Sequence, residues 1–277
     1  MSLWYYLCEV TGLEMLEWTF MRNALLAVLL MGPIFGLCST MIVSGKMSFF
    51  SDALGHSAFT GIAIGSFCSF VGPIWMAVLF SIGIALLFSW VRSRSKQASD
   101  TIIGVFSSTA VALGIFVATL GGGSFTKYNA YLVGDILTVT ASEILMLFLI
   151  LAGILVFYYL LGNKLTVINI YPQLASSRAF PVAAIQTAFT VIIAIVVTLS
   201  ISWVGLLIVN SLLVLPAASA RNVSRNLRQY CLFSVLFALL SGVAGLVISY
   251  YLGCSAGAAI CLALAVVFTI TFVFRKK

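Results

Sequence analysis

The chain has 277 residues, of which 62% are hydrophobic and only 8% are charged, and its mean hydropathy is +1.20. Soluble domains carry about 25% charged residues, so this composition excludes a soluble protein and predicts an all-α fold, a polytopic membrane helical bundle. The net charge of +7 fits the positive-inside bias of membrane proteins, and we expect no nucleic-acid partner.

Apolar stretches of about 18 residues or more are long enough to cross a bilayer. Nine such stretches follow one another: 23–43, 52–71, 73–90, 101–120, 142–161, 181–200, 202–219, 230–251 and 256–274. If 52–71 re-enters the membrane instead of crossing it, the count falls to eight. Residues 1–22, with several glutamates and aromatics, predict an amphipathic lead-in at the membrane surface. Residues 23–277 predict a single integral-membrane domain.

The basic residues predict the orientation of the chain. With the C-terminus in the cytosol, all but two of the 14 Lys and Arg lie on the cytosolic side, leaving Arg22 and Lys127 outside. Since cytoplasmic loops carry an excess of Lys and Arg, we expect nine spans with the N-terminus outside and the C-terminus in the cytosol. Eight spans would instead place the N-terminus inside.

The single histidine, His56, follows Asp52 by four residues. Residues four apart share one face of a helix, so the carboxylate and the imidazole can converge on one ligand. Ionisable residues in spanning segments are usually functional, although a helix-start acid and an interfacial histidine can simply satisfy each other. Asp and His suit a divalent transition metal such as Mn, Zn or Fe. Two side chains plus waters or carbonyls would make a site weak enough to release its ion.

The sequence offers little support for catalysis. It contains no phosphate-binding P-loop, no H-E-x-x-H and no G-x-S-x-G motif. We therefore expect no catalytic residues and no permanently bound cofactor, and any ATP must be hydrolysed by another subunit. Two function classes remain open at this point: a secondary carrier or channel that needs no ATPase, and a membrane-embedded enzyme or structural subunit.

Two further polar segments are candidates for function. Asn210 and Ser211 lie in a span that also contains Pro216; helix–helix packing is their first interpretation, and lining of a pathway is the second. The polar stretch 163–180 is a predicted cytosolic loop. Its residues 171–178 can form a short helix that contacts a cytosolic partner, or a plain connection.

Two motifs resemble a known family. Met47 to Gly65 is similar to the D-A-x-S-H-x-x-L-P-G-I-A-x-G signature of the integral-membrane permeases of manganese/zinc/iron ABC importers. Val204 to Arg221 is similar to that family's V-G-x-L-L-V-x-A-L-L-I-x-P-A-A-x-A-R span. The resemblance implies a metal-chelate-type permease of the bacterial cytoplasmic (inner) membrane, either homodimeric or paired with another permease. It also implies a cytosolic ABC ATPase dimer and an extracytoplasmic metal-binding protein as partners.

The resemblance also implies roles for individual residues. The metal-pathway residues of the family correspond to Asp52 and His56, and its ATPase-coupling loop aligns with Ile170 to Val182. The coupling residues expected there are Tyr171, Pro172, Gln173, Ala175 and Arg178. The chain departs from the family pattern at four places: Gly55 replaces Ser, Phe59-Thr60 replaces Leu-Pro, Tyr171 and Gln173 replace two acids of the coupling loop, and Ala179 replaces its usual Gly.

Overall fold

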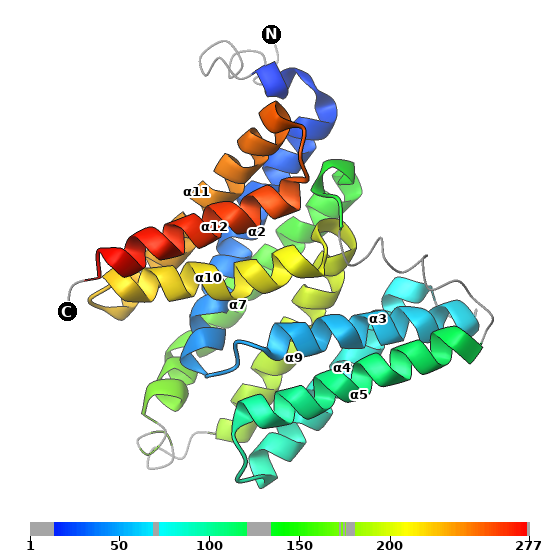
Figure 1. Cartoon of the computed structure of the whole chain (residues 1–277). Coiled ribbons are helices and arrows are strands. Elements are labelled where there is room, and N and C mark those ends of the chain that lie inside the picture. The colour runs from blue at the N-terminus through cyan, green and yellow to red at the C-terminus, as the bar shows by residue number, and fades with distance from the viewer. Residues whose placement is uncertain are drawn as a thin grey trace. The chain divides into compact units, whose positions relative to one another are not determined.

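The computed structural model describes residues 14–68, 72–120, 134–171, 173, 175 and 181–275. Every regular element within these ranges is a helix, so the predicted all-α class is confirmed (Figure 1). Two are short 3-10 helices, η1 (Glu14–Glu17) and η3 (Ile136–Thr138). The α-helices are α2 (Thr19–Ser44), α3 (Phe50–Cys68), α4 (Pro73–Arg94), α5 (Ser99–Leu120), α7 (Ala141–Ile170), α9 (Val182–Val204), α10 (Leu206–Val223), α11 (Leu227–Leu252) and α12 (Ala256–Val273).

Each of the nine apolar stretches of the sequence corresponds to one α-helix. In the described part of the chain, seven helices are long and apolar enough to span a membrane: α2, α4, α5, α7, α9, α11 and α12. The prediction of eight or nine spans is therefore slightly high. α3 is less apolar because its first half carries Asp52, His56 and small polar residues, and the apolar run of α10, Ile208–Val223, is shorter.

Glycine and proline set several helix ends. α4 begins at Pro73, whose missing N–H is not needed in a first helical turn. α9 ends at Val204 because Gly205 has a φ of 85°, a conformation that favours glycine. The predicted break between residues 200 and 202 is thus wrong: helical hydrogen bonding continues until the N–H of Gly205 donates to the carbonyl of Ile201 at 2.9 Å. The backbone of Gly134 packs directly against Gly205.

Two other boundaries differ from the prediction. α7 has 30 residues and continues to Ile170, so the first part of the predicted loop 163–180 is helical. The reason is that residues 162–170 include only one charged side chain, Lys164, and no helix breaker other than a glycine. The predicted lead-in over residues 1–22 lies partly outside the described residues, and its remainder forms η1 and the first turn of α2.

The helices pack as two compact units, each built from separated segments. The first contains Met1–Thr40, Asp135–Leu155 and Leu215–Lys277, and the second contains Met41–Gly134 and Val156–Val214. The first unit therefore holds most of α2 together with α11 and α12. The second holds α3, α4, α5 and α9, while α7 and α10 begin in one unit and end in the other.

In the first unit, α2 packs against α11 through small residues, as is common between membrane helices. A Cβ atom at Gly36 would lie 2.7 Å from the Cα of Val235, so the two backbones approach closely. One turn further on, the buried hydroxyls of Ser39 and Ser234 lie 2.9 Å apart and share a hydrogen bond. α11 packs in turn against α12 (Figure 1).

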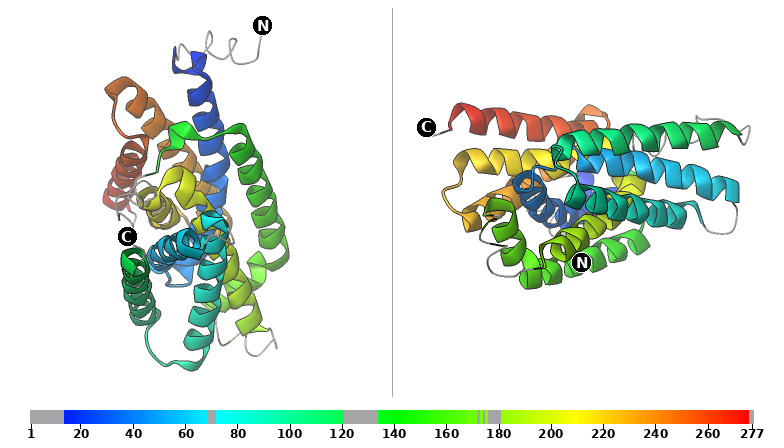
Figure 2. Two further views of the ribbon diagram at one scale, coloured as in Figure 1. Left: turned by 90° about the vertical axis from the view of Figure 1, so that its right-hand side faces the viewer. Right: turned by 90° about the horizontal axis from the view of Figure 1, so that it is seen from below.

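In the second unit, α3 is the central helix and packs against α4, α5 and α9 (Figure 2). Against α4, a Cβ atom at Gly61 would lie 3.0 Å from the backbone nitrogen of Ala77. Against α5, the hydroxyl of Thr60 donates a hydrogen bond to the carbonyl of Ala110 at 2.6 Å. α3 is therefore held by backbone approach on one side and by a buried hydrogen bond on the other.

We predict that Gly61→Ala lowers the stability of the protein by about 1–3 kcal/mol, because the added methyl group meets backbone atoms that cannot move aside. Thermal unfolding in detergent measures the effect. The matched control is Gly83→Ala in α4, where the added methyl group meets nothing within 4 Å; helix propensity makes this change neutral or stabilising. Equal melting temperatures for the two variants would contradict the close approach of α3 and α4.

Candidate functional site

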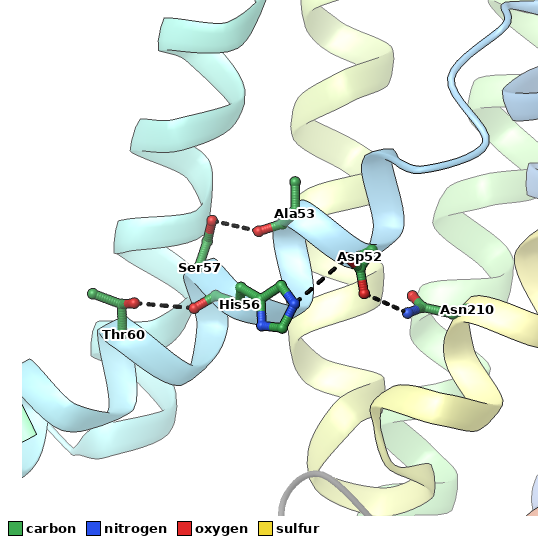
Figure 3. A network of polar contacts seen from close by, with 6 residues as sticks. All are labelled: Asp52, Ala53, His56, Ser57, Thr60 and Asn210. Atoms are coloured by element: carbon green, nitrogen blue, oxygen red, sulfur yellow. Dashed lines mark hydrogen bonds and ion pairs between the residues drawn. The ribbon is translucent and has the colours of Figure 1, made fainter. Parts of the chain in front are cut away.

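Asp52 and His56 lie one helical turn apart on the first half of α3 and face each other (Figure 3). Nε2 of His56 is 3.5 Å from Oδ2 of Asp52. The side chain of His56 is 30% exposed, and that of Asp52 is 45% exposed. The two groups therefore converge as the spacing predicts, and both remain accessible to a ligand; their role as metal ligands stays a prediction.

A residue of another helix completes this cluster. Nδ2 of Asn210 on α10 donates a hydrogen bond to Oδ1 of Asp52 at 3.1 Å (Figure 3). Ser107 of α5 also lies against the same carboxylate. Asp52 is thus a point where α3, α5 and α10 meet through polar side chains.

The start of α3 is fixed by packing and by a hydrogen bond. Phe50, the first residue of the helix, is buried, and its ring centroid lies 4.7 Å from that of Phe88 on α4. In the preceding turn, the guanidinium of Arg92 donates to the carbonyl of Gly45 at 3.3 Å. Asp52 consequently sits in the first turn of α3, where the helix dipole favours a carboxylate.

Gly55, which replaces the serine of the family pattern, brings α10 close to α3. A Cβ atom at Gly55 would collide with the side chain of Leu206, the first residue of α10, and would lie 3.1 Å from its Cγ. The absent side chain thus allows the approach. Asn210 follows Leu206 by one turn and reaches Asp52 as a result.

The chemistry of the cluster suits a cation. It offers a carboxylate, an imidazole and an amide, the ligand types that divalent transition metals accept from proteins. In the described ranges, no group of three or more His, Cys, Asp and Glu is placed to hold a metal ion. Asp52 and His56 would therefore share a cation with the Asn210 amide, backbone carbonyls or water.

The remaining residues proposed from the sequence lie on α10, at or beyond the end of α7, or outside the described residues. Ser211 is half-buried on α10. Tyr171, directly after α7, is 62% exposed. Gln173 is exposed and helical, and Ala175 is buried and helical, its N–H donating to the carbonyl of Tyr171 at 3.1 Å. The predicted coupling residues Pro172 and Arg178 lie outside the described residues.

The sequence predicts neither the contact of Asn210 with Asp52 nor that of Ser107. Helix–helix packing is the first interpretation of Asn210, and its hydrogen bond to Asp52, 158 positions away, joins α10 to α3. The available signal was an amide within an otherwise apolar span, which needs a partner when buried. Ser107 carries no distinguishing signal, because serine is common in the small-residue contacts of membrane helices.

The chain matches the ABC 3 transport family over residues 17–275. It is 26% identical to the high-affinity zinc uptake system membrane protein ZnuB of Haemophilus influenzae, over 92% of this chain and 97% of that protein. It is 27% identical to the manganese transport system membrane protein MntC of Listeria monocytogenes, over 95% and 93% of the two chains. Among solved structures it is similar to PsaBC from Streptococcus pneumoniae in complex with Fab, with a TM-score of 0.80 and 27% identity over 95% of this chain and 94% of that one.

The chain therefore belongs to the ABC 3 transport family. It is a multi-pass membrane permease of the ABC type, and the resemblance first carried by two motifs extends over nearly its whole length. Its family is one of transporter permease subunits, so the chain is a permease and not itself an enzyme.

We predict that Gly55 and Leu206 are energetically coupled. Leu206→Ala opens a cavity and costs about 2–5 kcal/mol because the side chain is buried, and Gly55→Ala alone costs less because the end of a flexible side chain can move. The methyl group added by Gly55→Ala enters the space left by Leu206→Ala. The double variant therefore loses less unfolding free energy than the two single variants lose together, by about 0.5–3 kcal/mol. Thermal unfolding of the four proteins in detergent gives this coupling; strict additivity would argue against the contact.

Proposed function

We propose that the chain is the permease subunit of an ATP-driven importer that moves a divalent transition-metal cation, Mn²⁺, Zn²⁺ or Fe²⁺, across the bacterial cytoplasmic membrane. The cation enters from an extracytoplasmic metal-binding protein, and a cytosolic ABC ATPase dimer supplies the energy. A second copy of the chain, or a paired permease, forms the other half of the pathway. The family membership and relatives named for zinc and manganese transport support this proposal.

The observation that carries the proposal is the pair of Asp52 and His56. The two groups lie 3.5 Å apart and are partly exposed, on a helix that packs against α4, α5 and α9, all apolar enough to span a membrane. A carboxylate and an imidazole in such surroundings are costly to keep unless they serve a purpose. Two protein ligands also hold a cation weakly enough for it to leave, as transport requires.

Movement of the cation then follows from alternating access, in which ATP binding and hydrolysis rearrange the helices around the cation. The coupling residues are Tyr171, Pro172, Gln173, Ala175 and Arg178. The exposure of Tyr171 at the end of α7 supports a contact with the ATPase there. In this arrangement the C-terminus lies in the cytosol, as the distribution of Lys and Arg predicts.

We expect Asp52→Asn and His56→Ala each to reduce metal accumulation at least tenfold, because each removes one of the two strongest ligands from the cation. Uptake of radiolabelled manganese and zinc measures this, in cells whose native copy is replaced by the variant. Co-purification of the ATPase checks that the complex still assembles. Asp100→Asn is the matched control, since it neutralises an acid in the first turn of α5 and should leave uptake within twofold. Wild-type uptake in both site variants would disprove the assignment.

The rival function is a secondary carrier or channel that needs no ATPase. Liposomes that contain the permease alone should admit no metal down a gradient, whereas liposomes that also contain the ATPase should accumulate metal only when ATP is supplied. The physical reason is that a closed permease needs the work of the ATPase to expose its site to the other side. Metal flux through the permease alone, with no effect of ATP, would favour the rival.

A further inference from the structure

We propose that Asn210 of α10 is a positioning residue that orients the Asp52 carboxylate and thereby sets which divalent metal the site prefers. This inference rests on the proposed function, since it concerns the same cation. It goes further because it assigns selectivity to a side chain on a different helix from the two expected ligands.

The first argument is geometric. Asn210 Nδ2 holds Oδ1 of Asp52 at 3.1 Å, while the other carboxylate oxygen, Oδ2, faces His56 at 3.5 Å (Figure 3). Each oxygen therefore has its own neighbour. With Oδ1 engaged by the amide, the carboxylate presents Oδ2, beside the imidazole, to a cation. A hydrogen bond to a ligating carboxylate of this kind fixes the ligand's orientation.

The second argument is the state of the amide oxygen. In the described part of the chain, Oδ1 of Asn210 is buried without a hydrogen-bond donor. A buried amide oxygen without a partner is unfavourable. The amide is therefore kept in this place at an energetic cost, and an unsatisfied buried polar group of this kind favours a role in the site over simple packing.

The third argument is the placement of Asn210 on a second helix. Because Gly55 admits Leu206, the first turn of α10 is held against α3. The amide is therefore positioned by packing and not by a flexible loop. A rigidly placed neighbour discriminates between metals more sharply than a mobile one.

The chemistry gives the direction of the effect. Carboxylate and carbonyl oxygens suit Mn²⁺, whereas imidazole suits Zn²⁺. Asn210→Asp keeps the size of the side chain but replaces the amide by a second carboxylate. The site then has more oxygen character, and its preference moves toward manganese.

The test measures uptake of radiolabelled manganese and zinc against concentration, in cells whose native copy is replaced by each variant. Removing a group that orients a metal ligand typically weakens metal binding about 10–100-fold. We therefore expect Asn210→Ala to raise the half-saturating metal concentration by about that factor, with the amount of assembled complex unchanged. We expect Asn210→Asp to raise the ratio of manganese to zinc uptake at least tenfold.

The matched control is Asn222→Ala. Asn222 lies on the same helix, is partly buried, and also donates through Nδ2 to a side-chain oxygen, that of Thr271 at 3.4 Å. This variant should leave both the half-saturating concentration and the metal ratio within twofold of wild type. A purely structural role for the amide at position 210 would lower the amount of complex and leave the metal ratio unchanged.

The experiments distinguish failure of the proposed function from failure of the role assigned to Asn210. If Asp52→Asn leaves uptake intact, the proposed function is wrong. If Asp52→Asn abolishes uptake while both Asn210 variants behave like Asn222→Ala, the proposed function stands and the role of Asn210 is refuted. If the Asn210→Ala variant does not assemble into the complex, the ratio of manganese to zinc uptake in the isosteric Asn210→Asp variant still tests the role of Asn210.

Discussion

A single carboxylate organises the polar part of this membrane protein. Asp52 contacts His56 on its own helix, Asn210 on α10 and Ser107 on α5. An ionisable group among apolar helices is tolerated only where polar neighbours or a bound ion compensate its charge. The neighbours of Asp52 come from three helices, so compensation of its charge depends on how these helices pack. The packing depends in turn on the polar contacts that the carboxylate makes.

The packing of these helices depends on the absence of side chains at two glycines of α3 as well as on the polar side chains of that helix. Gly55 and Gly61 let α10 and α4 approach the helix backbone, and Thr60 joins it to α5. Small residues are the usual means by which membrane helices associate, since lipid removes most of the hydrophobic driving force. The same substitutions that distinguish this chain from the family pattern, Gly55 and Thr60, therefore shape the surroundings of the site.

Most of the fold could be predicted because apolar runs of sufficient length leave the backbone little choice but helix. The nine stretches all became helices, and the spacing of Asp52 and His56 placed them on one face. The contact of Asn210 with Asp52 could not be predicted, since it depends on tertiary approach across the sequence. The end of α9 was missed because several apolar residues extend the helix up to Gly205.

The length of α7 has a mechanical consequence. Its 30 residues measure about 45 Å at 1.5 Å per residue, against a hydrocarbon layer of about 30 Å. A continuous helix of this kind is stiff along its axis and does not twist freely. The direction in which Tyr171 points around the helix axis is therefore set by the number of residues before it, because each residue turns the chain by about 100°. A single inserted residue would point Tyr171 in a new direction, whereas a change in side chain alone would not.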